Sequence, residues 1–168
     1  MYRPSPSLVL AILLLGAAAI AAMWLDDDFS TGLTGGDDGR DEISGRAKVI
    51  DGDSLEIGRT RIRLAGIDAP EGGQPHGNAA RRALERLAGS GMVKCISRGR
   101  DRYERMLAVC YAGKVNLNRR QVRGGHAWDY ARYSYGEYAG LERAARREGL
   151  GLWAGADPLP PWEWRHRQ

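Results

Sequence analysis

The chain is 168 residues long, about the length of one domain, and 27% of its residues are charged. Residues 1–44 hold two of the 25 basic residues but seven of the 21 acidic ones, so residues 45–168 hold 23 basic against 14 acidic residues, a formal charge of +9. Such an excess favours a polyanionic partner, and on charge alone an anionic membrane surface fits as well as a nucleic acid.

Residues 1–25 are predicted to form an apolar helix. The 18 residues from 8 to 25 are uncharged, with Arg3 before them and three aspartates after them. At the helical rise they measure about 27 Å, enough to cross a bilayer. Both a cleaved signal peptide and a signal-anchor transmembrane helix fit this segment. Either one exports the rest of the chain, to the periplasmic or extracytoplasmic face of the membrane if anchored, or as a secreted protein if cleaved.

Residues 26–44 are rich in Asp, Gly, Ser and Thr, which predicts an acidic, flexible linker without regular structure. The pattern then changes to short runs rich in β-branched residues, separated by turn signals. Strands are predicted at 46–50, 54–57, 60–67, 92–97 and 105–112. Apolar residues at helical spacing predict helices at 77–88, 115–122 and 137–147.

Strands followed by helices predict a small α+β domain. A five-stranded Greek-key barrel with one helix between its third and fourth strands is the oligonucleotide-binding (OB) fold, which we expect for residues 45–155. Residues 156–168 form a tail rich in Pro and Trp, to which we assign no catalytic part.

The two cysteines, Cys95 and Cys110, lack the Cys-x-x-Cys spacing of zinc and thioredoxin-like sites. They lie in consecutive predicted strands, where they could face each other. A disulfide and two buried free thiols both remain open.

Two stretches carry paired carboxylates. Residues 50–54 read Ile-Asp-Gly-Asp-Ser, a turn between strands, and the strand that contains Arg63 runs into Asp68, a proline and Glu71. Phosphodiester cleavage needs a cation, a positioned water and positive charge on the phosphate, and these side chains could supply or hold all three. On these stretches alone, a salt-bridged hairpin end fits equally well.

Together with a third stretch, Asp-Arg-Tyr-Glu-Arg at residues 101–105, these motifs resemble the staphylococcal nuclease (thermonuclease) family. The resemblance covers residues 46–153. It implies a nuclease of the OB fold that hydrolyses DNA or RNA with one calcium ion. Asp53 and Asp68 would be calcium ligands, together with the backbone carbonyl of Ala69.

The resemblance also implies roles for the arginines and for Glu71. Glu71 would orient or deprotonate the attacking water, while Arg63 and Arg105 would bind the scissile phosphate. Side chains expected to contact substrate are Arg102, Tyr103, Tyr130 and Tyr133. For the tyrosines of residues 130–135, packing in the core is the competing interpretation.

Two positions depart from the family pattern. Ala69 replaces a common threonine, which matters little if only its carbonyl is used. Glu104 replaces the glycine of the Tyr-Gly-Arg turn, where a positive φ angle would favour glycine and a carboxylate could compete with phosphate for Arg105.

We therefore expect an exported, monomeric, calcium-dependent nuclease. Two other classes fit parts of the chain: an OB-fold module that binds nucleic acid without cutting it, and a membrane-tethered adaptor for protein partners. The combination of acids and arginines argues against both, because a pure binder has little use for carboxylates that repel phosphate.

Overall fold

The structure, a computed structural model, describes residues 41–155 and 158–168. The predicted apolar helix at 1–25 and the predicted linker up to residue 40 lie outside these ranges. Within the described ranges, no helix combines the length and the apolar character that crossing a bilayer requires.

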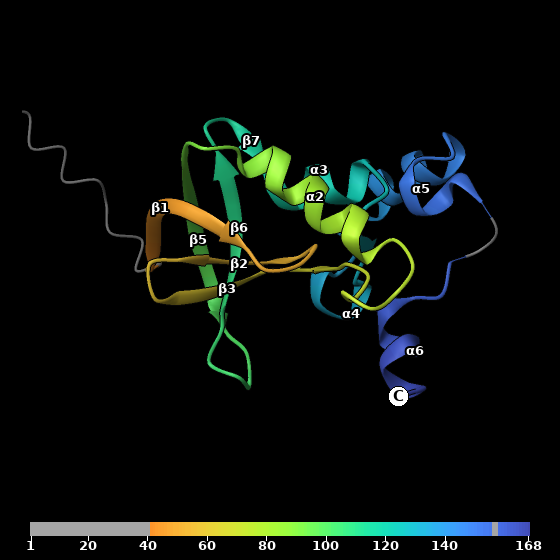
Figure 1. Cartoon of the computed structure of the whole chain (residues 1–168), viewed down its shortest axis with the longest axis horizontal. Helices are drawn as coiled ribbons and strands as arrows, with labels where there is room; N and C mark the ends of the chain where they lie inside the picture. The colour runs from red at the N-terminus through yellow and green to blue at the C-terminus, as the bar shows by residue number, and fades with distance from the viewer. Residues whose placement is uncertain (1–40, 156–157) are drawn as a thin grey trace, which may run out of the picture. The chain divides into compact units, whose positions relative to one another are not determined.

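Five strands close into a barrel, which confirms the predicted α+β class and OB-type barrel (Figure 1). The first three pair antiparallel as a meander, and the fourth pairs with the free edge of the first. The last strand pairs antiparallel with the fourth and parallel with the third, which closes the barrel. In chain order these strands are β1 (Glu42–Val49), β2 (Ser54–Ile57), β3 (Thr60–Leu64), β5 (Met92–Arg100) and β6 (Met106–Ala112).

The barrel interior is apolar because alternate residues along each strand point inward. Leu55, Ile62, Leu64 and Val93 are each 0% exposed. β1 alternates between exposed and half-buried residues along its whole length. This alternation begins at Glu42, four residues before the predicted strand, so the assignment of residues 42–44 to the linker was wrong.

The predicted strand at 60–67 is two strands in the structure. β3 ends at Leu64, and Gly66 takes a φ of 74°, which favours glycine and turns the chain. β4 (Ile67–Asp68) then leaves the barrel and pairs with β8 (Trp128–Asp129). This turn carries Asp68 back toward Arg63 instead of continuing the strand.

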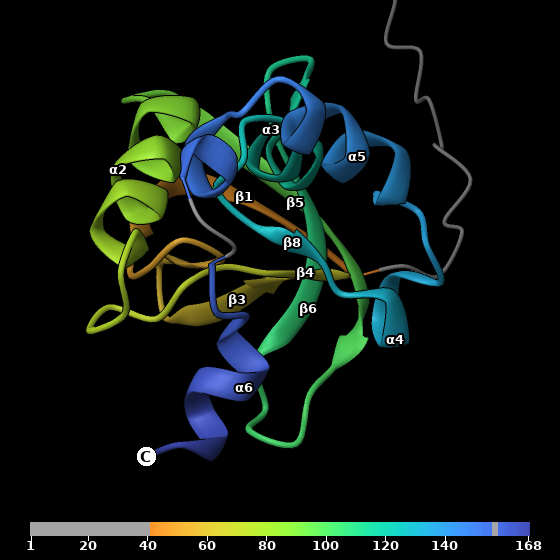
Figure 2. The same ribbon diagram turned by 90° about the vertical axis from the view of Figure 1, so that its right-hand side faces the viewer.

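Three helices match the predicted ones. These are α2 (Gly77–Ala88), α3 (Leu117–Arg123), which follows the short strand β7 (Val115–Asn116), and α5 (Ala139–Arg147). The structure adds the short helix α4 (Ala131–Ser134), the 3-10 turn η1 (Gly151–Ala154) and the helix α6 (Pro161–His166). In both views, α2, α3 and α5 lie at one end of the domain, and α6 and the turn joining β5 to β6 lie at the other (Figures 1 and 2).

Cys95 and Cys110 are directly opposite each other on β5 and β6. Their sulfur atoms are 2.00 Å apart and both residues are 0% exposed. Of the two alternatives that the sequence left open, the structure therefore contains the disulfide.

Candidate active site

One arginine joins the two carboxylates that were predicted to hold a metal. From β3, Arg63 donates through Nη1 to Asp53 Oδ1 at 2.6 Å and through Nη2 to Asp68 Oδ1 at 2.7 Å. The side chains of Asp53 and Asp68 are 4% and 0% exposed. Three residues from two separate motifs therefore meet in one cluster.

The turn before β2 holds Asp53 by several hydrogen bonds. The Asp53 amide donates to the side chain of Asp51, and Asp53 Oδ2 accepts from the Ala69 amide at 2.8 Å. Gly52 lies so close to its neighbours that an added Cβ would come within 2.6 Å of the Ala80 methyl and 2.7 Å of the Ala69 methyl. Glycine at this position thus lets the turn pack against α2.

Burial and charge act in opposite directions in this cluster. Burial raises the pKa of Asp53 to about 7, although the neighbouring guanidinium of Arg63 opposes this rise. Burial would lower the pKa of Arg63, but the carboxylates of Asp53 and Asp68 raise it above its ordinary value. Arg63 therefore stays charged at any working pH.

A buried glutamine supports the same turn from α3. Gln121 is 0% exposed and donates from Nε2 to the carbonyl of Gly52 at 2.6 Å and to that of Ala80 at 3.1 Å. Gln121 was not among the site residues predicted from the sequence. The sequence pattern that could have indicated it is a polar residue beside Val122, on the face of the predicted helix that packs inward.

Glu71 lies at the edge of the cluster and contacts a residue that the sequence analysis also missed. Arg165 of α6 donates through Nη1 to Glu71 Oε1 at 2.5 Å and through Nη2 to Asp68 Oδ2 at 2.7 Å. The tail to which no catalytic part was assigned thus places a guanidinium against the predicted base and a predicted metal ligand.

Arg105 has its own counter-ion. Its Nε donates to Asp101 Oδ2 at 2.8 Å, while Asp101 Oδ1 accepts from the amides of Tyr103 and Arg105. Burial, the largest single influence, raises the pKa of Asp101. The hydrogen bonds and the charge of Arg105 together outweigh burial, so the pKa lies below its ordinary value. Glu104 takes a φ of 60°, as expected for a position where the family pattern has glycine. Its carboxylate forms no ion pair within the described residues, so the competitor for Arg105 is Asp101.

Arg63, Glu71, Arg105 and Arg165 line one cavity of about 800 Å³. Arg102 and five tyrosines also line it, and Arg102 donates to the hydroxyl of Tyr103 at 2.6 Å. Tyr103 and Tyr133 are 64% and 57% exposed, whereas Tyr130 stacks on Trp162 of α6 with their ring centroids 5.4 Å apart. Tyr103 and Tyr133 are therefore open to a ligand, while one face of Tyr130 is covered.

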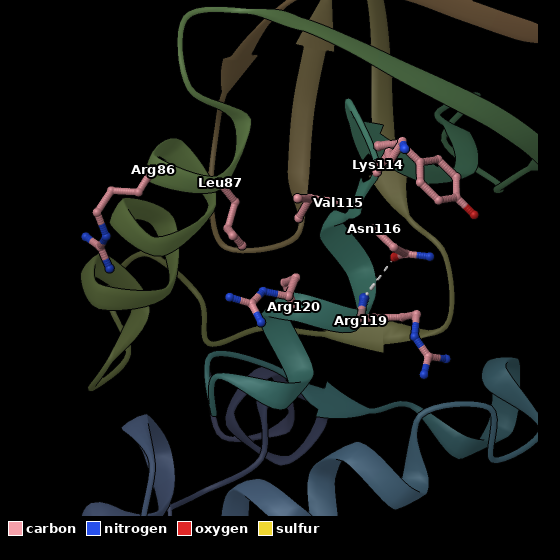
Figure 3. A pocket seen from close by; sticks show the side chains of 8 residues that line it. Arg86, Leu87, Lys114, Val115, Asn116, Arg119 and Arg120 are labelled. Atoms are coloured by element: carbon pink, nitrogen blue, oxygen red, sulfur yellow. Dashed lines mark hydrogen bonds between the residues drawn. The ribbon is translucent and has the colours of Figure 1, made fainter.

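A second cavity, of about 790 Å³, lies at the C-terminal end of α2 and the start of α3 (Figure 3). Four of its lining residues are basic, and among the described residues no acid lines it. The basic residues are Arg86, Lys114, Arg119 and Arg120. Because it is lined by four basic side chains and no carboxylate, this cavity suits an anion better than a metal ion.

The cluster around Arg63 is the place where a metal could bind. Within the described residues, no three His, Cys, Asp or Glu side chains converge as a complete metal site. Asp53 and Asp68 nevertheless provide carboxylate oxygens, the ligands that calcium prefers. Asp53 Oδ2 accepts one hydrogen bond, from Ala69, and Asp68 Oδ2 accepts one, from Arg165, so each oxygen has a further lone pair. The donor chemistry fits calcium if water and phosphate complete its shell.

An OB-type barrel with buried carboxylates, arginines and open tyrosines around one cavity is typical of enzymes that act on nucleic-acid phosphodiesters. Comparison with known proteins agrees. The model of the family described as staphylococcal nuclease homologue matches residues 61–155. The chain therefore belongs to the staphylococcal nuclease family, which confirms the resemblance and supports a nuclease with a nucleic-acid substrate.

Individual relatives are similar over most of their length. An uncharacterized endonuclease of Escherichia coli is 40% identical over 134 residues, which cover 76% of this chain and 88% of the relative. An uncharacterized endonuclease of Haemophilus influenzae is 38% identical over 127 residues, covering 72% and 71%. A micrococcal nuclease of Shigella flexneri is 37% identical over 134 residues, covering 70% and 77%.

Proposed function

We propose that this protein is a calcium-dependent nuclease that hydrolyses phosphodiester bonds in DNA and RNA by attack of water. The observation that carries this proposal is the bridge from Arg63 to Asp53 and Asp68 beside Glu71. A guanidinium that holds two carboxylates together keeps them close enough to share one cation. Membership of the family supports nuclease activity. The requirement for calcium and the two substrates, DNA and RNA, are what we propose.

Asp53 and Asp68 would hold the calcium ion, together with the carbonyl of Ala69. When bound, calcium would polarise the phosphate oxygens and favour the extra negative charge of the transition state. Arg63 is charged, only 17% exposed and fixed by two carboxylates, so it needs little reorganisation to stabilise the same charge.

Glu71 would orient the attacking water and accept its proton. It lines the cavity with a side chain that is 40% exposed, so its carboxylate can reach water there. Arg105 would bind the phosphate from the opposite turn, where Asp101 orients its guanidinium. Tyr103 and Tyr133 are more than half exposed, and bases could stack on the part of each ring that Arg102 or Arg132 does not cover.

We also propose that the domain acts as a monomer outside the cytoplasm. The apolar run at residues 8–25 and the Cys95–Cys110 disulfide support this location, since disulfides persist in oxidising compartments. Cell fractionation of the full chain would test it. Recovery in the cytoplasmic fraction with both thiols free would contradict it.

The test of activity uses the full chain with single-stranded DNA and RNA, in calcium or in chelator. We expect cleavage of both in calcium and none in chelator. Arg63→Ala and Glu71→Gln should each lower the rate about 100- to 1000-fold, the usual loss when one transition-state contact is removed. Arg61→Ala is the matched control for Arg63, because Arg61 lies on the same strand with a side chain that is 77% exposed.

Full activity in chelator would contradict the calcium assignment. Binding that weakens with salt, without cleavage under any condition, would instead identify a nucleic-acid-binding module. If the chain neither bound nor cleaved nucleic acid, that result would point to the protein-adaptor class.

A further inference from the structure

We propose that Arg165 of the C-terminal helix is a third phosphate-binding arginine of the active site, beside Arg63 and Arg105. Through it, α6 would be part of the substrate site instead of a passive tail. This inference rests on the proposed nuclease function and adds a residue to it.

Aromatic and polar contacts attach α6 to the domain next to the cavity. Trp162 stacks on Tyr130 with the two ring planes 2° apart, and its edge meets Trp128 with centroids 6.2 Å apart. Just before the helix, the carbonyl of Leu159 accepts from Nε2 of the buried Gln74 at 2.5 Å. Figure 2 shows α6 at the end of the barrel that also carries the β5–β6 turn.

The helix geometry then determines where Arg165 lies. Residues three apart lie on the same face of a helix, so the anchor at Trp162 directs Arg165 toward the same side. The guanidinium reaches Glu71 and both oxygens of Asp68, although these residues are more than 90 positions away in the chain. Arg165 lines the cavity and its side chain is 40% exposed.

The guanidinium has donors left for a ligand. Arginine carries five N–H groups, and Arg165 uses Nη1 and Nη2 for three hydrogen bonds to carboxylates. Its Nε forms no hydrogen bond within the described residues. Because Glu71 is the proposed partner of the attacking water, a donor 2.5 Å from Glu71 lies within side-chain reach of the phosphate that this water attacks.

The charge of the site also favours a third arginine. Asp53, Asp68 and Glu71 carry three formal negative charges, and Arg63 neutralises one of them. Arg105 does not change this sum, because Asp101 pairs with it. Counting these four side chains and a divalent cation, the charge would sum to zero without Arg165 and to +1 with it. Arg165 would therefore strengthen the attraction of the site for a phosphate diester.

A cation on Asp68 and the guanidinium of Arg165 would share acceptor atoms. Asp68 Oδ2 accepts its one hydrogen bond from Arg165, so a cation at this oxygen weakens the hold of Asp68 on the arginine. The side chain is long and partly exposed, so it can turn toward the phosphate while α6 stays anchored by Trp162.

The test measures binding of phosphorothioate-linked single-stranded DNA, which resists cleavage, to the full chain in calcium across a range of salt. Arg165→Gln should weaken binding about 10- to 100-fold, as expected for charge-assisted hydrogen bonds. The slope of log affinity against log salt should fall by about 0.7, the value for one phosphate contact on a single strand. Arg165→Lys should restore the slope but only part of the affinity, because a lysine lacks the bidentate fork.

Arg167→Gln is the matched control, since Arg167 lies just after the same helix, is 67% exposed and pairs only with Glu163 among the described residues. It should change neither affinity nor slope beyond about two-fold. With cleavable DNA, Arg165→Gln should raise KM about ten-fold and change kcat much less, as expected for a contact made in both ground and transition states.

Unchanged affinity and slope for Arg165→Gln, while the parent chain binds, would overturn this inference and leave the proposed function standing. Tighter calcium binding by calorimetry together with faster cleavage would also overturn it, since Arg165 would then obstruct the site. A parent chain that binds no DNA in calcium would instead contradict the proposed function itself.

Discussion

At the scale of single residues, the site depends on one arginine with two acceptors. A lysine at position 63 would place its ammonium at one point, whereas the planar fork of Arg63 reaches Asp53 and Asp68 at the same time. Without that fork, Asp53 would lose the one ion pair it makes among the described residues, and its buried carboxylate would repel that of Asp68. The same contact therefore holds the site together and keeps a positive charge ready for phosphate.

Glu104 carries a prediction about stability. Its φ of 60° is a conformation in which an L side chain costs about 1–2 kcal/mol, and glycine removes that cost while adding some entropy to the unfolded chain. Glu104→Gly should therefore raise the free energy of unfolding by about 0.5–1 kcal/mol in denaturant titrations. Activity should change little, because Asp101 holds Arg105 in both variants.

The control for Glu104 is Glu85→Gly, in the middle of α2, where an exposed glutamate has ordinary helical geometry. That change should lower the stability by about 1 kcal/mol, the usual cost of glycine in a helix. If both variants moved in the same direction, the backbone of Glu104 would not be under strain.

The site residues that lie close together in the sequence could be predicted from their motifs. Those that reach the site from a distant part of the chain could not. Asp53, Arg63 and Asp68 lie within 16 positions of one another and meet as expected. Arg165 contacts Glu71 across 94 positions, and nothing in its tail resembles a chemical motif. A long-range contact of this kind can be identified only from the three-dimensional arrangement of the barrel and α6.

At the scale of elements, α3 connects the barrel to the active-site turn through polar side chains. Asn118 is 0% exposed, accepts from the Cys110 amide and donates to the carbonyls of Ala65 and Ala108. One turn later, Gln121 holds Gly52. A short helix thus satisfies backbone groups within β6, just after β3 and in the turn before β2.

Gln121→Leu should therefore loosen the turn that carries Asp53. The variant leaves the buried carbonyls of Gly52 and Ala80 without these donors, which should cost roughly 2–3 kcal/mol of unfolding free energy. Hydrogen exchange of the amides at residues 51–53 should become faster. Arg119→Leu, on the exposed side of the same helix, should leave both quantities unchanged, and equal behaviour of the two variants would contradict the role of Gln121.

Element prediction succeeded where periodicity was strong. The bounds of α2 match the predicted 77–88, because its apolar face repeats at helical spacing. The strand predicted at 60–67 failed at Gly66, since the apolar pattern continues across a backbone turn that only the φ angle reveals. The short helix α6 was missed because six residues give too little periodicity, and its position depends on Trp162 stacking on Tyr130.

At the scale of the whole domain, the two cavities lie at opposite ends of β6. Arg105 lies just before β6, in the active-site cavity, which is lined by both acidic and basic residues. Tyr111 and Lys114 line the basic cavity at the other end of β6. Seven residues of extended strand separate these ends by roughly 20 Å. The +9 charge of residues 45–168 is therefore spread over both ends, and long substrates can be attracted to the domain away from the site of cleavage.

The disulfide acts on the same scale, because it joins β5 to β6, and β6 closes the barrel against β3. A bridge across 15 positions removes enough freedom from the unfolded chain to stabilise the fold by about 3 kcal/mol. Reducing it should lower the thermal unfolding midpoint by roughly 10 °C. The reductant should have no effect on Cys95→Ala/Cys110→Ala, the matched control. An equal midpoint for oxidised and reduced parent chain would mean that the bridge adds nothing to the backbone pairing and packing of β5 and β6.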